Sequence, residues 1–348
     1  IVLPYIRSAR EGVLRLGALI EEHGVAEGFG VGFVDSHETW YLETASGHRW
    51  LACRMPEDQY FVTGNQSRFR HYDPHDTEHY LASADLIEHA IQHGLYDPAK
   101  GDFDFHEAYI RDVALDTTYN YPRVWGLQAM LSPSIPNDVT CNTFPVFARA
   151  EHPLGMDDLR RVFRFHYQGT EHDPYLHANP REPYRPVSIF RTTQTHILQV
   201  RPELPQAIGR INYVALGMAD LGVFLPLYQG IKSYPEAYTK GTNHSSHDSA
   251  YWKFRKVQAL GMVNYNRYAP LIQETYARFE AETDARQREM EQRYLAVYES
   301  QPYYAAELLQ SFSDQILLKA LQVTDELIET LFTRLTEDIQ EEYLFHGA

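Results

Sequence analysis

Four short segments near the start of this chain alternate polar and apolar residues and are joined only by tight turns. They comprise residues 27–34, 40–45, 50–55 and 59–64. The connections contain turn-forming sequences such as Pro56-Glu57-Asp58. A parallel pair of strands needs a crossover of roughly a dozen residues or more, so connections this short permit only antiparallel pairing. The sequence therefore predicts an antiparallel meander of these four segments.

The residues before the meander predict a helix. From Val2 the apolar positions recur with helical spacing as far as Ile20, and His23-Gly24 is a typical C-terminal stop. We expect this helix to begin without the polar cap that usually marks the start of a domain. The chain starts with Ile1 rather than Met, and its opening residues are already apolar. We therefore expect that a leader or a whole first segment preceded Ile1.

Blocks of helices and strands follow along the rest of the chain. Helical spacing is found at 83–93, 105–114, 122–130 and 156–166, a proline-rich loop at 172–186, strand patterns at 188–200 and 208–216, and helix from 247 almost to the end. This order predicts an α+β layered fold rather than alternating βαβ units. We expect one domain over residues 1–246 and a helical extension over 247–348. The charged stretch 274–293 is interpreted as a solvated helix face.

Composition excludes several classes of protein. With 44% hydrophobic residues among 348, the chain can bury a sizeable core, which excludes disorder over most of its length. Its formal net charge of −16 disfavours nucleic acid and anionic membranes as partners. The apolar run at 211–227 is interrupted by polar residues and glycines, so it does not predict a membrane span. Two cysteines provide no disulfide framework, which favours a reducing, cytoplasmic location.

Three motifs suggest chemistry that their surroundings do not support. Gly28-Phe29-Gly30-Val31-Gly32 resembles half of a dinucleotide fingerprint, but it lies in a predicted strand that is followed by a hairpin turn. Neither Cys53, in a strand, nor Cys141, in a loop without an adjacent His, resembles an activated thiol. The 17 histidines include three local groups without a His-Glu-x-x-His arrangement, and a metal hydrolase built on them stays a third alternative. The groups are His71 with His75 and His79, His89 with His93, and His244 with His247 and Asp248.

Two segments are more informative. Tyr60-Phe61-Val62-Thr63-Gly64-Asn65 predicts a strand that ends in a carboxamide donor, at the kind of strand end where active sites gather. Tyr121-Pro122-Arg123 predicts an Arg in the first turn of a helix. A cation there opposes the helix macrodipole, so we expect a carboxylate partner or an anionic substrate group near Arg123.

These segments also carry a family resemblance. Residues 1–32, 38–66, 120–133 and 195–205 resemble the cysteine dipeptidases of the N-terminal-nucleophile (Ntn) hydrolase superfamily, which are related to penicillin V acylase and the bile salt hydrolases. The block ETWYLETASGHRWLACRMPEDQYFVTGNQ is the most specific part. The resemblance extends over most of the chain, to the helix that begins with Ser249-Ala250-Tyr251-Trp252 and beyond.

The resemblance implies a four-layer αββα sandwich and hydrolysis of dipeptides, with no metal or cofactor. The family's nucleophile is an N-terminal Cys whose own α-amine accepts the thiol proton. That Cys and its neighbours precede the segment that matches Ile1, so the sandwich is expected to be incomplete at the N-terminus and this chain alone inactive. Asn65 matches the family's oxyanion donor, and Arg123 matches the Arg that orients the nucleophile and its carboxylate neighbours.

The remaining expectations concern substrate and assembly. Tyr41, Glu43 and His48, close to the meander, are candidates for binding the substrate amine and its flanking groups. Missing strands would leave a sheet edge open, which predicts either a separate N-terminal portion or a homo-oligomer contact. The alternative function is a non-catalytic module that binds peptides or assembles with itself.

Overall fold

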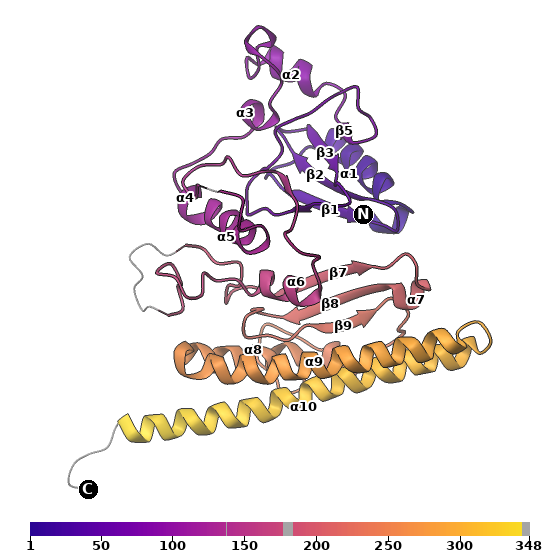
Figure 1. Cartoon of the computed structure of the whole chain (residues 1–348), viewed down its shortest axis with the longest axis vertical. Helices are drawn as coiled ribbons and strands as arrows, with labels where there is room; N and C mark the ends of the chain where they lie inside the picture. Colours follow the sequence, from indigo (N-terminus) through magenta and orange to yellow (C-terminus); the bar gives the residue numbers. More distant parts are fainter. Residues whose placement is uncertain (137, 177–183, 343–348) are drawn as a thin grey trace. The chain divides into compact units, whose positions relative to one another are not determined.

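The protein is a mixed α+β structure with antiparallel sheets and long C-terminal helices, as the sequence predicts (Figure 1). The computed structural model describes residues 1–136, 138–176 and 184–342. The chain forms two compact units. The first comprises Ile1–Leu154 and the described part of Glu182–Arg185, and the second comprises Gly155–Arg181 and Pro186–Ala348 as far as they are described.

The first unit holds most of the short elements. In chain order they are η1 (Leu3–Tyr5), α1 (Ala9–His23), β1 (Gly30–Val34), β2 (Thr39–Thr44), β3 (Trp50–Arg54), β4 (Tyr60–Phe61), β5 (Tyr80–Ala82), α2 (Leu86–Gln92), η2 (Pro98–Lys100), α3 (Phe105–Tyr109), α4 (Asp116–Tyr119), α5 (Tyr121–Leu131) and β6 (Phe147–Ala148).

The main sheet of this unit corrects the predicted meander in one place. Its strand order is β1-β2-β3-β5, and all the pairings are antiparallel. The expected fourth segment, 59–64, forms only the two-residue strand β4, which pairs with β6 instead. The edge of β3 is taken by β5, with Cys53 opposite Tyr80. Residues 63–66 turn away because the Thr63 hydroxyl donates to the Gln66 carbonyl, and this turn ends the strand.

Helix α1 covers one face of the main sheet. It begins at Ala9 rather than near Val2, and Ser8 caps it by accepting from the Glu11 amide, so the expected absence of a polar cap is wrong. It ends as predicted at His23, with Gly24 at a φ of 73°. Apolar side chains of α1 and of the sheet bury each other: Ala9, Val13, Ile20, Phe33, Trp40, Leu42, Trp50 and Ala52.

The second unit contains the other sheet and the long helices. Its elements are α6 (Met156–Phe163), β7 (Gln194–Val200), α7 (Gln206–Gly209), β8 (Arg210–Leu216), β9 (Leu225–Tyr228), η3 (Glu236–Tyr238), α8 (Ala250–Val263), α9 (Tyr265–Val297) and α10 (Pro302–Glu342). Strands β7, β8 and β9 form an antiparallel sheet in that order. Part of the proline-rich loop predicted at 172–186 lies outside the described residues.

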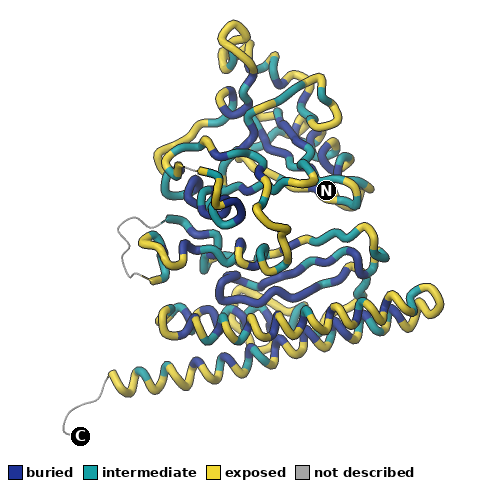
Figure 2. Tube along the Cα trace, viewed as in Figure 1, coloured by how far each residue is buried: buried dark blue, intermediate teal, exposed yellow. Residues whose placement is uncertain are grey.

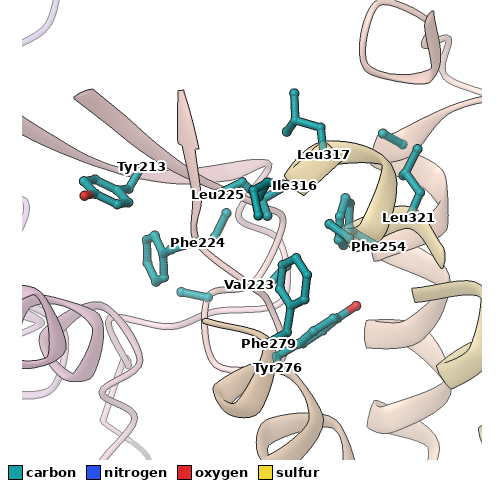
Figure 3. Close-up of a cluster of buried hydrophobic side chains, with 14 of the residues drawn as sticks. Tyr213, Val223, Phe224, Leu225, Phe254, Tyr276, Phe279, Ile316, Leu317 and Leu321 are labelled. Atoms are coloured by element: carbon teal, nitrogen blue, oxygen red, sulfur yellow. The ribbon is translucent and has the colours of Figure 1, made fainter. Parts of the chain in front are cut away.

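A large apolar core joins this sheet to helices α8, α9 and α10. Tyr213 and Leu225 of the sheet belong to this cluster with Phe254, Tyr276 and Ile316 of the helices, and Figure 3 shows Leu225 beside Ile316. Along α9 and α10 the buried residues recur on one side while the other stays exposed (Figure 2). The three helices therefore belong to the same compact unit as β7 to β9. The domain division expected at residues 246 and 247 stays a prediction.

The charged part of α9 is only partly the solvated face that was predicted. Glu282 and Arg288 are exposed, but Glu280 is only 3% exposed. Its carboxylate accepts from Arg164, at 2.7 Å, and from the Phe224 amide, at 2.8 Å. Burial of a charge requires partners of this kind, which a pattern of charges along one helix does not reveal. Among the described helices, none is long and apolar enough to cross a membrane.

Candidate functional site

A pocket of about 570 Å³ in the first unit gathers three of the five predicted site residues. Tyr41 and Glu43, two residues apart on β2, both line it, and so does Asn65. Three stretches of chain contribute most of the other lining residues: 27–30, 64–67 and 110–113. A second hollow of about 470 Å³, lined by 57–60 and 150–154, contains none of the predicted residues. The first pocket is therefore the candidate site.

Arg123 fixes the direction in which the Asn65 carboxamide can donate. Arg123 Nη1 lies 2.9 Å from Asn65 Oδ1. A guanidinium can only donate, so the atom facing it must be the carboxamide oxygen. The Nδ2 hydrogens of Asn65 then remain to donate elsewhere. The two residues are 58 positions apart in the chain, and this contact holds a donor group at the pocket wall.

Asn120 joins this pair and was missed by the sequence analysis. Its Oδ1 accepts from Arg123 Nη2, at 2.6 Å, and from the Asn65 backbone amide, at 2.9 Å. Its Nδ2 donates to Asp116 Oδ1 at 2.5 Å. Asp116, Asn120 and Arg123 follow the i, i+4, i+7 spacing of one helix face. That spacing was the available signal, although α4 ends and α5 begins at Asn120.

Several hydrogen-bond acceptors surround the Arg123 guanidinium. Arg123 is the third residue of α5, as predicted. Three of its hydrogen bonds go to neutral oxygens: Asn65 Oδ1, Asn120 Oδ1 and the Tyr119 carbonyl at 2.8 Å. Its guanidinium reaches back past the first turn of the helix, to residues that precede α5. These oxygens help to stabilise a cation at this end of a helix, and the expected carboxylate partner or anionic substrate group near Arg123 stays a prediction.

Glu43 anchors the loop that carries Asn65. Its side chain is 3% exposed. Glu43 Oε2 accepts from the Ser67 hydroxyl at 2.5 Å and from the Phe69 amide at 3.2 Å, while Oε1 accepts from the Arg68 amide at 2.8 Å. Burial raises the pKa of Glu43 against the opposing effect of these donors. Its oxygens thus point into the loop that follows Asn65.

Tyr41 lies on the pocket side of β2 and explains a glycine of β1. A side chain at Gly30 would overlap the Tyr41 hydroxyl. Close packing on the sheet, predicted for the small residues of the 28–32 motif, is therefore confirmed at Gly30, whereas a Cβ at Gly28 or Gly32 would make only ordinary contacts. Strand β2 follows β1 through a hairpin turn. The Tyr41 and Phe61 rings are tilted by 44° relative to each other, with centroids 4.8 Å apart. Burial, with the Glu43 charge nearby, raises the pKa of the Tyr41 hydroxyl.

His48 does not join these residues. It is exposed, and its Nδ1 lies 2.8 Å from the carbonyl oxygen of Glu21, near the end of α1. Among the predicted histidine groups, His79 Nδ1 lies 2.9 Å from Asp76 Oδ2, but in the part of the chain that the structure describes no group of three or more His, Cys, Asp or Glu could hold a metal ion. His89 and His93 stack on each other with ring centroids 4.1 Å apart.

The two cysteines have the environments that the sequence suggests. Cys53 is 4% exposed in β3, and burial raises its pKa to about 12. A thiol with that pKa is protonated at neutral pH and is a poor nucleophile. Cys141 is partly exposed, and its Sγ lies 3.0 Å from the Thr143 hydroxyl. Neither residue lines the candidate pocket.

Comparisons with known proteins agree with the resemblance. The model of peptidase family C69 matches residues 1–278, most of the chain. This protein belongs to peptidase family C69.

Its relatives are named as dipeptidases. A "Probable dipeptidase" of Salmonella dublin is 54% identical over 242 residues, which is 69% of this chain and 56% of that protein. A "Probable dipeptidase A" of Streptococcus pyogenes is 38% identical, over 77% of this chain and 58% of that protein. The "Dipeptidase" of Bifidobacterium longum is 34% identical, over 75% of this chain and 52% of that protein. The chain thus spans little more than half the length of the curated relatives it matches.

Proposed function

We propose that this chain is the larger, C-terminal part of a cysteine-type dipeptidase. The observation that carries the proposal is the Asn65 carboxamide on the wall of a pocket: Arg123 holds its oxygen, and its NH₂ group donates to no other described residue. Membership of family C69 and the names of the relatives support the substrate class. The four-layer Ntn sandwich is part of the same proposal.

The proposed reaction is acyl transfer through a thiol. A cysteine thiolate attacks the carbonyl carbon of the peptide bond, and the carbonyl oxygen becomes an oxyanion. Asn65 Nδ2 donates a hydrogen bond to that oxyanion, which is worth about 3–4 kcal/mol of barrier. The C–N bond then breaks, the amine leaves with a proton, and water hydrolyses the thioester to release the acid.

The nucleophile in this proposal is an N-terminal cysteine outside these 348 residues. Cys53, with a pKa raised to about 12 by burial, is unsuited to the role, and Cys141 does not line the pocket. The proposal includes the α-amine of that N-terminal residue as the base. Free Cys53 and Cys141 fit a reducing compartment such as the cytoplasm.

The test is a dipeptidase assay on the complete gene product that carries these residues. We expect hydrolysis of unmodified dipeptides that an alkylating reagent abolishes and a chelator leaves unchanged. Asn65→Ala should lower kcat by roughly 100- to 1000-fold with little change in KM. An unchanged kcat would remove Asn65 from the oxyanion role, and loss of activity with chelator would favour a metal hydrolase instead.

Cys53→Ala and Cys141→Ser provide the controls for the thiol. Both variants should hydrolyse dipeptides at close to the wild-type rate and should still be inactivated by the alkylating reagent. If Cys141→Ser were inactive but folded, the nucleophile would lie within this chain.

The second candidate is a non-catalytic module that binds peptides or assembles with itself. Exposed apolar side chains on α10, including Leu318, Phe332 and Ile339, favour self-assembly. Sedimentation velocity on the complete protein tests this expectation of a homo-oligomer. Peptide binding without any hydrolysis by the complete gene product would favour the non-catalytic module over the enzyme.

A further inference from the structure

Two charged side chains on the wall of the candidate pocket have no partner among the described residues. Arg111 and Glu27 are both exposed and line the pocket. We propose that they bind the two charged ends of a dipeptide zwitterion, with Arg111 receiving the α-carboxylate and Glu27 the α-ammonium group. This inference rests on the proposed dipeptidase function and names the residues that would set the length of its substrate.

The other carboxylates around the pocket are already engaged. Glu43 accepts three hydrogen bonds from the loop after Asn65. Asp116 accepts from the Val113 amide, at 2.8 Å, and from Asn120. These acids are used to build the walls, so an incoming ammonium group would have to compete with existing donors for them.

Asp112 is engaged in the same way. Its Oδ1 lies 3.1 Å from His106 Nε2 and 3.3 Å from Asn142 Nδ2. Glu27 is therefore the pocket carboxylate whose oxygens are available to a ligand within the described residues.

Arg111 also differs from Arg123, the other arginine at the site, in its hydrogen-bond partners. Arg123 is committed to Asn65, Asn120 and the Tyr119 carbonyl. The Arg111 guanidinium, in contrast, donates to none of the residues that the structure describes, and a guanidinium matches a carboxylate with two parallel hydrogen bonds. A C-terminal carboxylate is the anionic group that every dipeptide carries.

The arrangement of the walls matches the chemistry of a dipeptide. Glu27, Asn65 and Arg111 come from the three different stretches that line the pocket. A dipeptide presents an ammonium group, one peptide carbonyl and a carboxylate, with its ends roughly 6–7 Å apart when extended. A tripeptide moves its carboxylate by about another 3.5 Å, so binding both ends at fixed side chains selects for length.

The carboxylate site is tested with a dipeptide and its C-terminal amide as substrates. We expect the complete wild-type protein to prefer the free acid by roughly 10- to 100-fold in kcat/KM, mainly through KM. Arg111→Gln should reduce that preference to less than about 3-fold, while Arg111→Lys should retain part of it. Arg7→Gln removes the same charge from an exposed position outside the pocket and should leave the preference unchanged.

The ammonium site is tested with a dipeptide and its des-amino analogue. Glu27→Gln should reduce the preference for the free amine to less than about 3-fold, and Glu88→Gln, an exposed control on α2, should not. Both pocket positions are exposed, so circular dichroism should show unchanged folding.

Calorimetric binding to the alkylated protein separates this inference from the proposed function. If the protein cleaves dipeptides but Arg111→Gln keeps the full preference for the free acid, the inference is overturned and the function stands. If dipeptides bind with a preference that depends on Arg111 but are never cleaved, the dipeptidase proposal fails and the binding site stands. Absence of both binding and cleavage would overturn both.

Discussion

A carboxamide can present either an oxygen or an NH₂ group, and at Asn65 a neighbouring residue makes that choice. Because the Arg123 guanidinium can only donate hydrogen bonds, the carboxamide oxygen Oδ1 of Asn65 must face it. The Nδ2 group of Asn65 then points in the other direction, where it can donate to another acceptor. The same logic applies at Asn120, whose Oδ1 receives two donors and whose Nδ2 faces the Asp116 carboxylate. The proposed oxyanion role of Asn65 requires a donor that is oriented before the reaction, and these hydrogen bonds would supply that orientation.

This arrangement predicts that Arg123 acts as a positioning residue. In the complete gene product, Arg123→Ala should lower kcat by at least about 10-fold while KM changes little, because the Asn65 carboxamide loses its fixed direction. Arg123→Lys should recover only part of the rate, since a single ammonium group cannot bond both Asn65 and Asn120 in the same geometry.

Added guanidinium ion at millimolar concentration should restore part of the Arg123→Ala rate, which a purely structural role would not allow. If Arg123→Ala chiefly lowers the unfolding midpoint and leaves kcat intact in the remaining folded protein, Arg123 is a stabilising residue and not a positioning one.

At the scale of elements, close packing decides whether a glycine can be replaced. Gly17 lies in the middle of α1, and a side chain there would overlap the Trp50 indole. Helix propensity alone favours Ala over Gly by about 1 kcal/mol. Overpacking a fixed core costs about 1–3 kcal/mol, so the steric effect should win.

We therefore predict that Gly17→Ala destabilises the folded state by up to about 2 kcal/mol, measured by denaturant unfolding. Leu14→Ala, at a position of the same helix that is 48% exposed, should change stability far less. A stabilised Gly17→Ala variant would show that α1 can move away from Trp50 without loss of packing.

A buried histidine ties two elements of the second unit together. His166 Nδ1 lies 3.0 Å from Asp173 Oδ1, and Nε2 lies 3.0 Å from the Tyr265 hydroxyl, which donates to Asp220. Both ring nitrogens face acceptors, an arrangement that suits the imidazolium form. Burial alone would lower the pKa of His166, but the hydrogen bonds and charges of Asp220 and Asp173 outweigh it and raise the pKa above 6.5.

The raised pKa predicts a stability that falls with pH. The contribution of protonated His166 is fully present below its unfolded pKa of about 6.5 and is lost as pH rises through the higher folded value. The thermal unfolding midpoint of the wild type should therefore fall between pH 6 and alkaline pH. In His166→Gln the midpoint should depend less on pH over the same range. An identical pH dependence in the variant would assign the effect to other groups.

At the scale of the whole molecule, charge is unbalanced. The sequence contains 31 Lys and Arg against 47 Asp and Glu, a formal net charge of −16. Such an excess destabilises a compact state by self-repulsion, which salt screens. Individual ion pairs, such as Arg160 with Asp284 and Arg201 with Glu291, act in the opposite direction because salt weakens them.

We predict that self-repulsion dominates over the whole chain. The unfolding midpoint should therefore rise between roughly 10 mM and 300 mM NaCl, concentrations over which the screening length falls from about 30 Å to less than 10 Å. Differential scanning fluorimetry measures this directly. A midpoint that falls with added salt would mean that the ion pairs outweigh the net charge.

Local features of the sequence determined much of this protein. Hydrophobic spacing located α1, β1, β2, β3 and α5 to within a few residues in most cases, and the α+β class followed from their order. The alternation in β3 also predicted that Cys53 is buried. These features depend on neighbouring residues, whose periodicity along the chain reports which side of an element is buried. The family motifs singled out Asn65 and Arg123.

Only the tertiary structure decided which distant residues meet. In the folded protein β3 pairs with β5 instead of β4, and Asn65 lies beside Arg123. The tertiary structure also directed the Glu43 carboxylate into the loop after Asn65. Strand-edge pairing and the satisfaction of buried polar groups depend on segments that are far apart in the chain. No local pattern specifies those partners, because they are selected by the packing of the folded unit as a whole.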